Sequence, residues 1–334
     1  MIQSVDFRNF KVLWKTKLDL GRFTLIVGPN GSGKTTALQA LQAAANPGSY
    51  TFEHLASVGY PCSTVEVVVH WGNPYNGLTT KAIWPSAGDR DQIYQDQEGR
   101  RVGDPTASSL RKFLTRIRSY SLDATAIANP VRLQPNLELA HNGGLLPGVL
   151  DQLRDREPER FEALNRELAR WLPEFDRVLF STPGSGVRAF LLRTHQQHHT
   201  IGASDLSQGT LLALAILTVA YLPDPPSIVC FEEPDRGIHP RLLREVRDAL
   251  YRLSYPESFG DSREPAQVVA TTHSPYFLDL FKDHPDEVII AQKVGVEARF
   301  EPLSQRSDLQ EILESAHLGE VWYSGILGGV PSGG

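Results

Sequence analysis

The chain has 334 residues, of which 41% are hydrophobic and 22% charged, and its formal net charge is −6. This composition is ordinary for a soluble globular protein, and the length suits two lobes or one large domain with an insertion. The negative charge argues against nonspecific adhesion to nucleic acid by the whole surface, although it leaves room for a local basic patch. Two cysteines, Cys62 and Cys230, stand in unrelated contexts and imply no disulfide framework.

Targeting and membrane signals are weak. The N-terminus lacks the basic-then-apolar layout of a signal peptide, and the longest apolar run, residues 211–222, is too short to cross a bilayer. We therefore expect a cytoplasmic protein that makes no contact with a membrane.

The first third of the chain predicts strands around one helix. Residues 2–7 alternate like an edge strand, and residues 23–27 form an apolar run typical of a buried strand. After the loop 28–35, residues 36–44 consist of strong helix formers. Residues 65–71 predict another strand, and the Gly-, Pro-, Asn- and Asp-rich stretch 72–104 predicts irregular hairpins and loops.

The loop 28–35 reads Gly-Pro-Asn-Gly-Ser-Gly-Lys-Thr and matches the phosphate-binding pattern G-x-x-x-x-G-K-[ST] at every fixed position. Its glycines let backbone N–H groups converge on phosphate oxygens, and the helix that follows adds the partial positive charge of its N-terminus. Lys34 would neutralise the β- and γ-phosphates, and the Thr35 hydroxyl would bind Mg²⁺. The residues expected to bind ATP here are Asn30, Gly31, Ser32, Gly33, Lys34, Thr35 and Thr36.

The middle of the chain predicts helices. Leu110, Phe113, Leu114 and Ile117 would share one helix face, and an amphipathic helix begins at Pro158. No heptad pattern is sustained, so we expect no coiled-coil arm. We divide the chain into an ATPase lobe with a β subdomain (1–104), an inserted helical lobe (105–185) and a segment that completes the ATPase core (186–334).

The last third alternates strands and helices. Strands are expected at 187–193, 228–231, 267–272 and 287–290, with a helix over 242–253. This alternation predicts an α/β fold whose core is a mostly parallel sheet covered on both faces.

Paired acids follow the strand expected at 228–231. A carboxylate at the end of such a strand can hold Mg²⁺, and a second one beside it can orient the attacking water. We assign Glu232 to the metal and Glu233 to the base, the alternative being a plain acidic surface turn.

The order of the motifs resembles that of the ABC-type ATPases. The phosphate loop is followed by Leu-Ser-Gln-Gly at 206–209, by the paired acids, and by Thr-His-Ser-Pro at 272–275. The resemblance implies a P-loop fold of ABC type with an antiparallel β subdomain and an inserted helical lobe. It also implies that Ser207 and Gly209 contact ATP held by the other subunit, that Asp235 faces that subunit, and that His273 touches the γ-phosphate. On its own the Leu-Ser-Gln-Gly signature is a weak signal, because serine and glycine before a helix are ordinary in N-capping. For His273 the alternative is a capped core histidine at a strand end, and the role at the γ-phosphate is favoured over it.

Several details resemble the RecF-like branch that includes the overcoming-lysogenization-defect (OLD) and abortive-infection ATPases. The first acid is Glu232 rather than Asp, Thr210 follows the signature, and residues 234–240 read Pro-Asp-Arg-Gly-Ile-His-Pro. This branch implies ATP hydrolysis by a head-to-tail dimer or higher oligomer. It also implies a nucleic-acid-linked role, with DNA or RNA, in antiviral defence or DNA repair, and a separately encoded, nuclease-like effector. Rival hypotheses are a membrane-transporter motor and a clamp that binds ATP without hydrolysis. No residue is assigned to the loop glutamine that contacts Mg²⁺ in such enzymes.

A histidine cluster and the C-terminal tail give weaker signals. His195, His198 and His199 could bind a metal, but a polar hairpin is the better reading. The glycine-rich apolar tail 318–330 should dock either on its own core or on a partner, and its composition favours neither.

Overall fold

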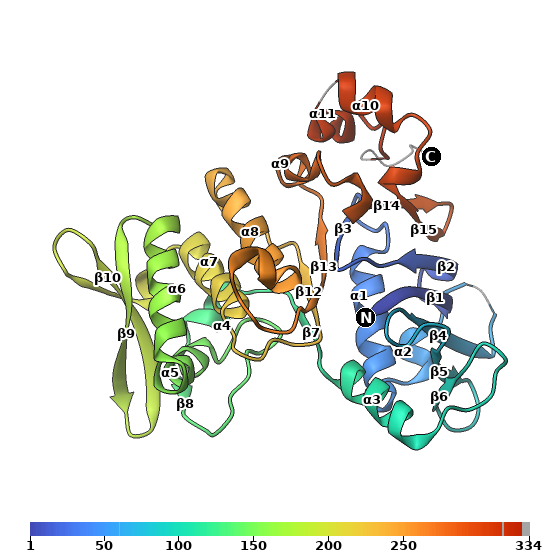
Figure 1. The fold of residues 1–334 in the computed structure, drawn as a ribbon, viewed down its shortest axis with the longest axis horizontal. Coiled ribbons are helices and arrows are strands. Elements are labelled where there is room, and N and C mark those ends of the chain that lie inside the picture. The colour runs from blue at the N-terminus through green and yellow to red at the C-terminus, as the bar shows by residue number, and fades with distance from the viewer. Residues whose placement is uncertain (60, 316, 329–334) are drawn as a thin grey trace. The chain divides into compact units, whose positions relative to one another are not determined.

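A computed structural model describes residues 1–59, 61–315 and 317–328 (Figure 1). The chain forms two compact units. Unit 1 comprises Met1–Ser119, Pro226–Cys230 and Ala266–Gly334, and unit 2 comprises Tyr120–Pro225 and Phe231–Pro265. Each unit is therefore assembled from segments that are far apart in the sequence. The sequence-based division at residues 104 and 185 stays a prediction.

The central sheet has six strands in the order β15-β14-β3-β13-β12-β7. β3 pairs in parallel with β13 and with β14, whereas β14 and β15 are antiparallel. Every residue of β3 and β13 is buried, as expected for inner strands of a parallel sheet. The strands are β3 (Phe23–Val27), β7 (Ile117–Tyr120), β12 (Ile228–Glu232), β13 (Gln267–Thr272), β14 (Val288–Val294) and β15 (Glu297–Pro302).

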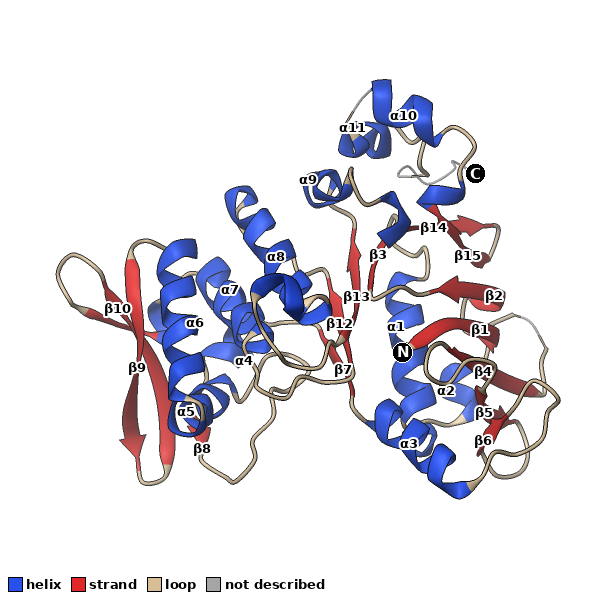
Figure 2. Ribbon diagram, in the orientation of Figure 1, coloured by secondary structure: helices blue, strands red, loops and turns tan. Residues whose placement is uncertain are grey.

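Unit 1 contains a second, antiparallel sheet in the order β2-β1-β4-β5-β6. Buried and more exposed residues alternate along β4 and β5, because one face of this sheet packs on the core. Helix α1 (Lys34–Ala45) contacts both sheets and shares one hydrophobic core with them (Figure 2). The strands are β1 (Ile2–Phe10), β2 (Leu13–Asp19), β4 (Thr64–Trp71), β5 (Thr79–Pro85) and β6 (Asp91–Gln95).

Apart from α3, which has 12 residues like α1, the remaining helices of unit 1 are short. The helix expected to carry Ile117 ends earlier, because Ile117 leaves it to begin β7. The helices are α2 (Phe52–Leu55), α3 (Asp104–Thr115), α9 (Pro275–Leu278), α10 (Leu309–Ser315) and α11 (Leu318–Tyr323).

Unit 2 combines helices with a small antiparallel sheet, in which β9 and β11 both pair with β10 and β10 also pairs with β8 (Figure 2). Helix α7 is buried from Thr210 to Ala220, since α4, α6 and α8 all contact it. The helices are α4 (Ala124–Ala128), α5 (Leu146–Arg156), α6 (Pro158–Trp171), α7 (Gln208–Ala220) and α8 (Leu243–Ser254). The strands are β8 (Val131–Arg132), β9 (Phe175–Gly184), β10 (Val187–Thr194) and β11 (Thr200–Gly202).

Among the helices of the described residues, none combines the length and the apolar character needed to cross a bilayer.

Candidate functional site

The loop expected to bind phosphate connects β3 to α1 in unit 1. Gly31 and Gly33 have φ angles of 77° and 93°, in the left-handed region that glycine adopts without strain. Gly33 is also the N-cap of α1, so Lys34 and Thr35, the last residues of the loop, carry the first N–H groups of the helix. This is the strand–loop–helix arrangement that a phosphate-binding loop requires.

Two of the loop glycines are enclosed so tightly that a Cβ atom would not fit. A Cβ on Gly28 would lie 2.5 Å from the carbonyl oxygen of Ala291 and 2.4 Å from Oγ of Ser32. A Cβ on Gly33 would lie 2.6 Å from the Ala298 Cβ. Gly31, by contrast, has no neighbouring atom within 4 Å of that position. The loop is thus pressed against β14 and β15 on one side, while Gly31 and Asn30 are exposed.

Lys34 lies folded over the loop. Its ammonium group donates hydrogen bonds to the carbonyl oxygens of Gly28, at 2.6 Å, and Pro29, at 3.0 Å. The residue is only 6% exposed, whereas Thr35 beside it is exposed. A positive charge is therefore held at the loop next to helical N–H groups, a combination that suits a phosphate group.

His273 lies beside the start of this loop. The parallel register of β13 and β3 places Thr272 opposite Val27, and the N–H of Gly28 donates to the Thr272 carbonyl at 3.4 Å. His273 and Gly28 are the next residues on the two strands, so both emerge at the same end of the sheet. The His273 side chain is exposed there. Unit 1 thus brings together the loop and the histidine that the sequence separates by more than 200 positions.

The paired acids belong to unit 2. Glu232 is the last residue of β12, and Glu233 follows with a φ angle of 48°. A non-glycine residue in this region carries backbone strain, and such residues cluster at functional sites. The turn is closed by hydrogen bonds from the Arg236 N–H to the Glu233 carbonyl and from the Ile238 N–H to the Asp235 carbonyl.

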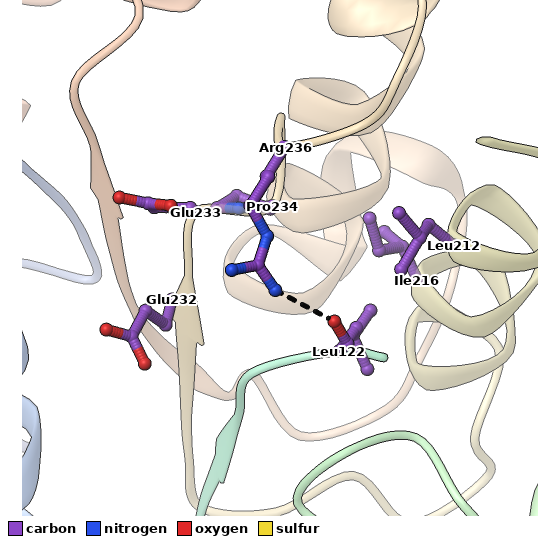
Figure 3. A pocket seen from close by; sticks show the side chains of 7 residues that line it. All are labelled: Leu122, Leu212, Ile216, Glu232, Glu233, Pro234 and Arg236. Atoms are coloured by element: carbon purple, nitrogen blue, oxygen red, sulfur yellow. Dashed lines mark hydrogen bonds between the residues drawn. The ribbon is translucent and has the colours of Figure 1, made fainter. Parts of the chain in front are cut away.

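A small pocket lies next to the acids (Figure 3). Both carboxylates point away from Leu212 and Ile216, whereas the Arg236 guanidinium turns inward and donates to the Leu122 carbonyl at 3.1 Å. Arg236 was not singled out from the sequence, although its place in the turn after the paired acids was a usable signal. The pocket is lined by Leu122, Leu212, Ile216, Glu232, Glu233, Pro234 and Arg236.

The signature residues also lie in unit 2. Ser207 is the N-cap of α7, and its hydroxyl accepts from the Thr210 N–H at 3.2 Å. Gly209 packs against the acidic turn, because a Cβ on it would lie 3.0 Å from the Gly237 carbonyl oxygen. Unit 2 therefore brings the signature turn and the turn after the paired acids into contact. Capping explains the Ser207 hydroxyl within the unit, and its reach toward a second subunit stays a prediction.

The donors present suit the groups that the motifs imply. The exposed side of the loop is open at Gly31, where no atom lies within 4 Å of the Cβ position, so a phosphate can approach the backbone N–H groups there. The Thr35 hydroxyl and the Glu232 carboxylate are oxygen donors of the kind that Mg²⁺ prefers. Within residues 1–59, 61–315 and 317–328, no group of three or more His, Cys, Asp or Glu side chains could hold a metal, so the histidines at 195, 198 and 199 form no such site.

Comparison with known proteins places the chain in a family. The family model described as "AAA domain, putative AbiEii toxin, Type IV TA system" matches residues 87–279, more than half of the chain. The chain belongs to this AAA family. A second model, described as an AAA ATPase domain, matches residues 1–84.

Relatives of this AAA protein include an OLD nuclease from Thermus scotoductus, which is 24% identical over 87% of this chain and 64% of that protein. A DNA double-strand break repair Rad50 ATPase from Methanopyrus kandleri is 28% identical over 30% of this chain and 12% of that protein. The chain therefore spans less than two thirds of the length of either relative. The predicted resemblance to the OLD and RecF-like branch of ABC-type ATPases is confirmed.

Solved structures agree on the fold. The Smc head bound to the C-winged helix domain of ScpA superposes with a TM-score of 0.66 at 18% identity, covering 93% of this chain and 99% of that one. An Smc head with an extended coiled coil, derived from Pyrococcus furiosus, gives a TM-score of 0.61 at 16% identity, covering 93% and 98%. The predicted P-loop fold of ABC type, with its antiparallel β subdomain, is confirmed.

Proposed function

We propose that this chain is an ATPase that closes, head to tail, with a second copy of itself around bound ATP. The observation that carries this proposal is the loop 28–35, which combines an exposed Gly31 in a left-handed conformation, the N-terminus of α1 and the Lys34 ammonium within eight residues. The AAA family membership supports the same activity.

In the proposed reaction, the backbone N–H groups of residues 30–36 and the Lys34 ammonium hold the phosphates of ATP. Mg²⁺ bound through Thr35 and Glu232 would offset the negative charge of the phosphates. Glu233 accepts a hydrogen bond from water and orients it toward the γ-phosphorus, and it takes the proton as the water attacks. His273 donates to the γ-phosphate, and hydrolysis reopens the dimer.

The second copy completes each site in this proposal. Ser207 and Gly209 of one copy reach the γ-phosphate held by the other, and the N-terminus of α7 adds its dipole. Asp235 faces the neighbouring copy. The strained Glu233 and the contact between Gly209 and the acidic turn support a linked response of these two turns to ATP.

The biological role that we propose is a nucleic-acid-linked switch in antiviral defence or DNA repair, acting in the cytoplasm with a separately encoded, nuclease-like effector. The names of the relatives support it, because one is an OLD nuclease and the other a DNA double-strand break repair ATPase. Either DNA or RNA could be the stimulating polymer, and the dimer could assemble further.

Phosphate release by the wild type and by Glu233→Gln, with and without DNA or RNA, tests the activity. The variant should lose about 100- to 10,000-fold in turnover and should elute as a dimer in the presence of ATP. Glu159→Gln, at an exposed position in unit 2, is the matched control. Wild-type protein that binds ATP but releases no phosphate under any condition would reject the ATPase in favour of a clamp.

Ser207→Asn tests the role in trans. Asparagine is as good an N-cap as serine, so the stability of α7 should be kept. We expect the ATP-dependent dimer to be lost nevertheless. Retention of both the dimer and the turnover would mean that Ser207 serves only as the cap.

A further inference from the structure

The described part of the C-terminal tail packs against the rest of unit 1. Helix α11 lies against α9, the short helix that follows His273 (Figure 1). Leu318 and Leu327 are fully buried, and Trp322 is 4% exposed. Of the tail 318–330 that the sequence left without an assigned partner, residues 329 and 330 lie outside the described residues.

The approach of α11 to α9 depends on Gly319. Its N–H donates to the Asp279 carboxylate at 2.7 Å. A Cβ at this position would lie 2.6 Å from the Pro275 carbonyl oxygen and 2.9 Å from the Pro275 carbonyl carbon. Because both of these are backbone atoms, any larger residue would have to move one helix away from the other.

Trp322 extends the contact to the histidine itself. Its indole N–H donates to the backbone carbonyl of His273 at 3.4 Å. Beyond this turn, Phe277 packs edge-to-face on Phe281, and Phe281 stacks on Phe23 at the start of β3. The segment that carries His273 is thus held by α11 on one side and by the core of unit 1 on the other, while the imidazole is exposed.

We infer that α11 is a clamp that sets the position of His273, with Trp322 as a positioning residue acting through the His273 carbonyl. The clamp is a property of unit 1, and its effect on catalysis rests on the proposed role of His273 at the γ-phosphate. Displacing α11 would let the turn 272–275 shift relative to the phosphate loop.

Hydrogen exchange tests the clamp without reference to catalysis. Gly319→Ala should make the amides of Phe277 and Leu278 exchange about tenfold faster or more, because the helix that covers them is pushed away. Gly48→Ala, where the nearest atom to the new Cβ lies 4.0 Å away, is the control and should leave these amides unchanged. Equal exchange in Gly319→Ala and the wild type would overturn the clamp.

Kinetics test the route through His273. Trp322→Phe keeps the aromatic ring and loses the N–H donor, so kcat should fall about 2- to 10-fold while KM for ATP stays the same. Tyr323→Phe removes a polar group from the neighbouring residue, which is 82% exposed, and should change neither constant. In a double-mutant cycle, Trp322→Phe should have no further effect once His273 is replaced by Ala.

The outcomes separate the two proposals. Additive effects of Trp322→Phe and His273→Ala, or a fall in kcat equalled by Tyr323→Phe, would refute the positioning role. A wild-type protein without turnover would refute the ATPase, whereas the exchange rates of Gly319→Ala would still decide whether α11 holds the turn.

Discussion

Replacing Gly28, Gly31 and Gly33 one at a time by alanine separates two reasons for a glycine in the phosphate loop. Gly28 has no left-handed φ angle and is constrained only by crowding, while Gly31 has a φ of 77° and open space around it. Gly33 combines a φ of 93° with a Cβ position 2.6 Å from the Ala298 methyl group. Gly28→Ala therefore tests crowding alone, Gly31→Ala tests the backbone conformation alone, and Gly33→Ala tests both effects together.

The magnitudes follow from these geometries. A left-handed conformation costs a non-glycine residue about 1–2 kcal/mol, which is the whole expected loss for Gly31→Ala. Overpacking adds about 1–3 kcal/mol, so Gly33→Ala should lose roughly 2–5 kcal/mol. Gly28→Ala should lose about 1–3 kcal/mol or more, because one of its contacts is the backbone oxygen of Ala291.

The assay is thermal unfolding of each variant beside ATP binding measured by calorimetry. One kcal/mol corresponds to about 2–4 °C for a cooperative unit of 150–250 residues. Gly33→Ala should therefore melt several degrees below Gly31→Ala. ATP binding should weaken in all three variants, since each one moves the backbone N–H groups that face the phosphates. Gly48→Ala is the control and should lose nothing in either measurement.

Two results would refute this reasoning. If Gly33→Ala were as stable as Gly31→Ala, Ala298 of β15 would not crowd the Cβ position of residue 33 as the structure shows. If Gly28→Ala bound ATP as tightly as the wild type, the loop would not be shaped by its contact with β14.

The remaining predictions concern single groups. Burial raises the pKa of the Cys230 thiol to about 12, so a thiol reagent at pH 8 should label Cys62 in the folded protein and Cys230 only after denaturation. Burial by itself would raise the pKa of Asp261, but the hydrogen bond from Arg160 and the neighbouring guanidinium charges lower it to about 2. The ionised form thus adds stability above about pH 4, the unfolded value, and loses it as the pH falls toward 2. Asp261→Asn should accordingly lower the Tm at neutral pH, and the difference in Tm between the variant and the wild type should shrink as the pH is lowered toward 2. Glu233→Gly should be about 1–2 kcal/mol more stable than Glu233→Ala in the same melts, because only glycine adopts a φ of 48° without strain.

Local patterns in the sequence were sufficient to locate the motifs of the candidate site. The phosphate loop, the strand before it and the helix after it are adjacent in the chain, so their geometry depends on short-range rules for glycine, apolar runs and helix formers. The same holds for the strand that ends in Glu232. The order of these motifs indicated the ABC-type fold, which the comparisons confirm.

Only the tertiary structure shows why residue 28 must be a glycine and what the indole of Trp322 contacts. Gly28 is crowded by Ala291, more than 260 positions later, and Trp322 reaches the carbonyl of His273, 49 positions earlier. No periodicity or local propensity encodes such contacts, because they exist only once β14 and α11 have docked on their neighbours. The end of α3 before Ile117 has the same origin, since pairing in the central sheet outweighs a helical pattern. Close packing between distant segments, rather than any local preference, decides these features.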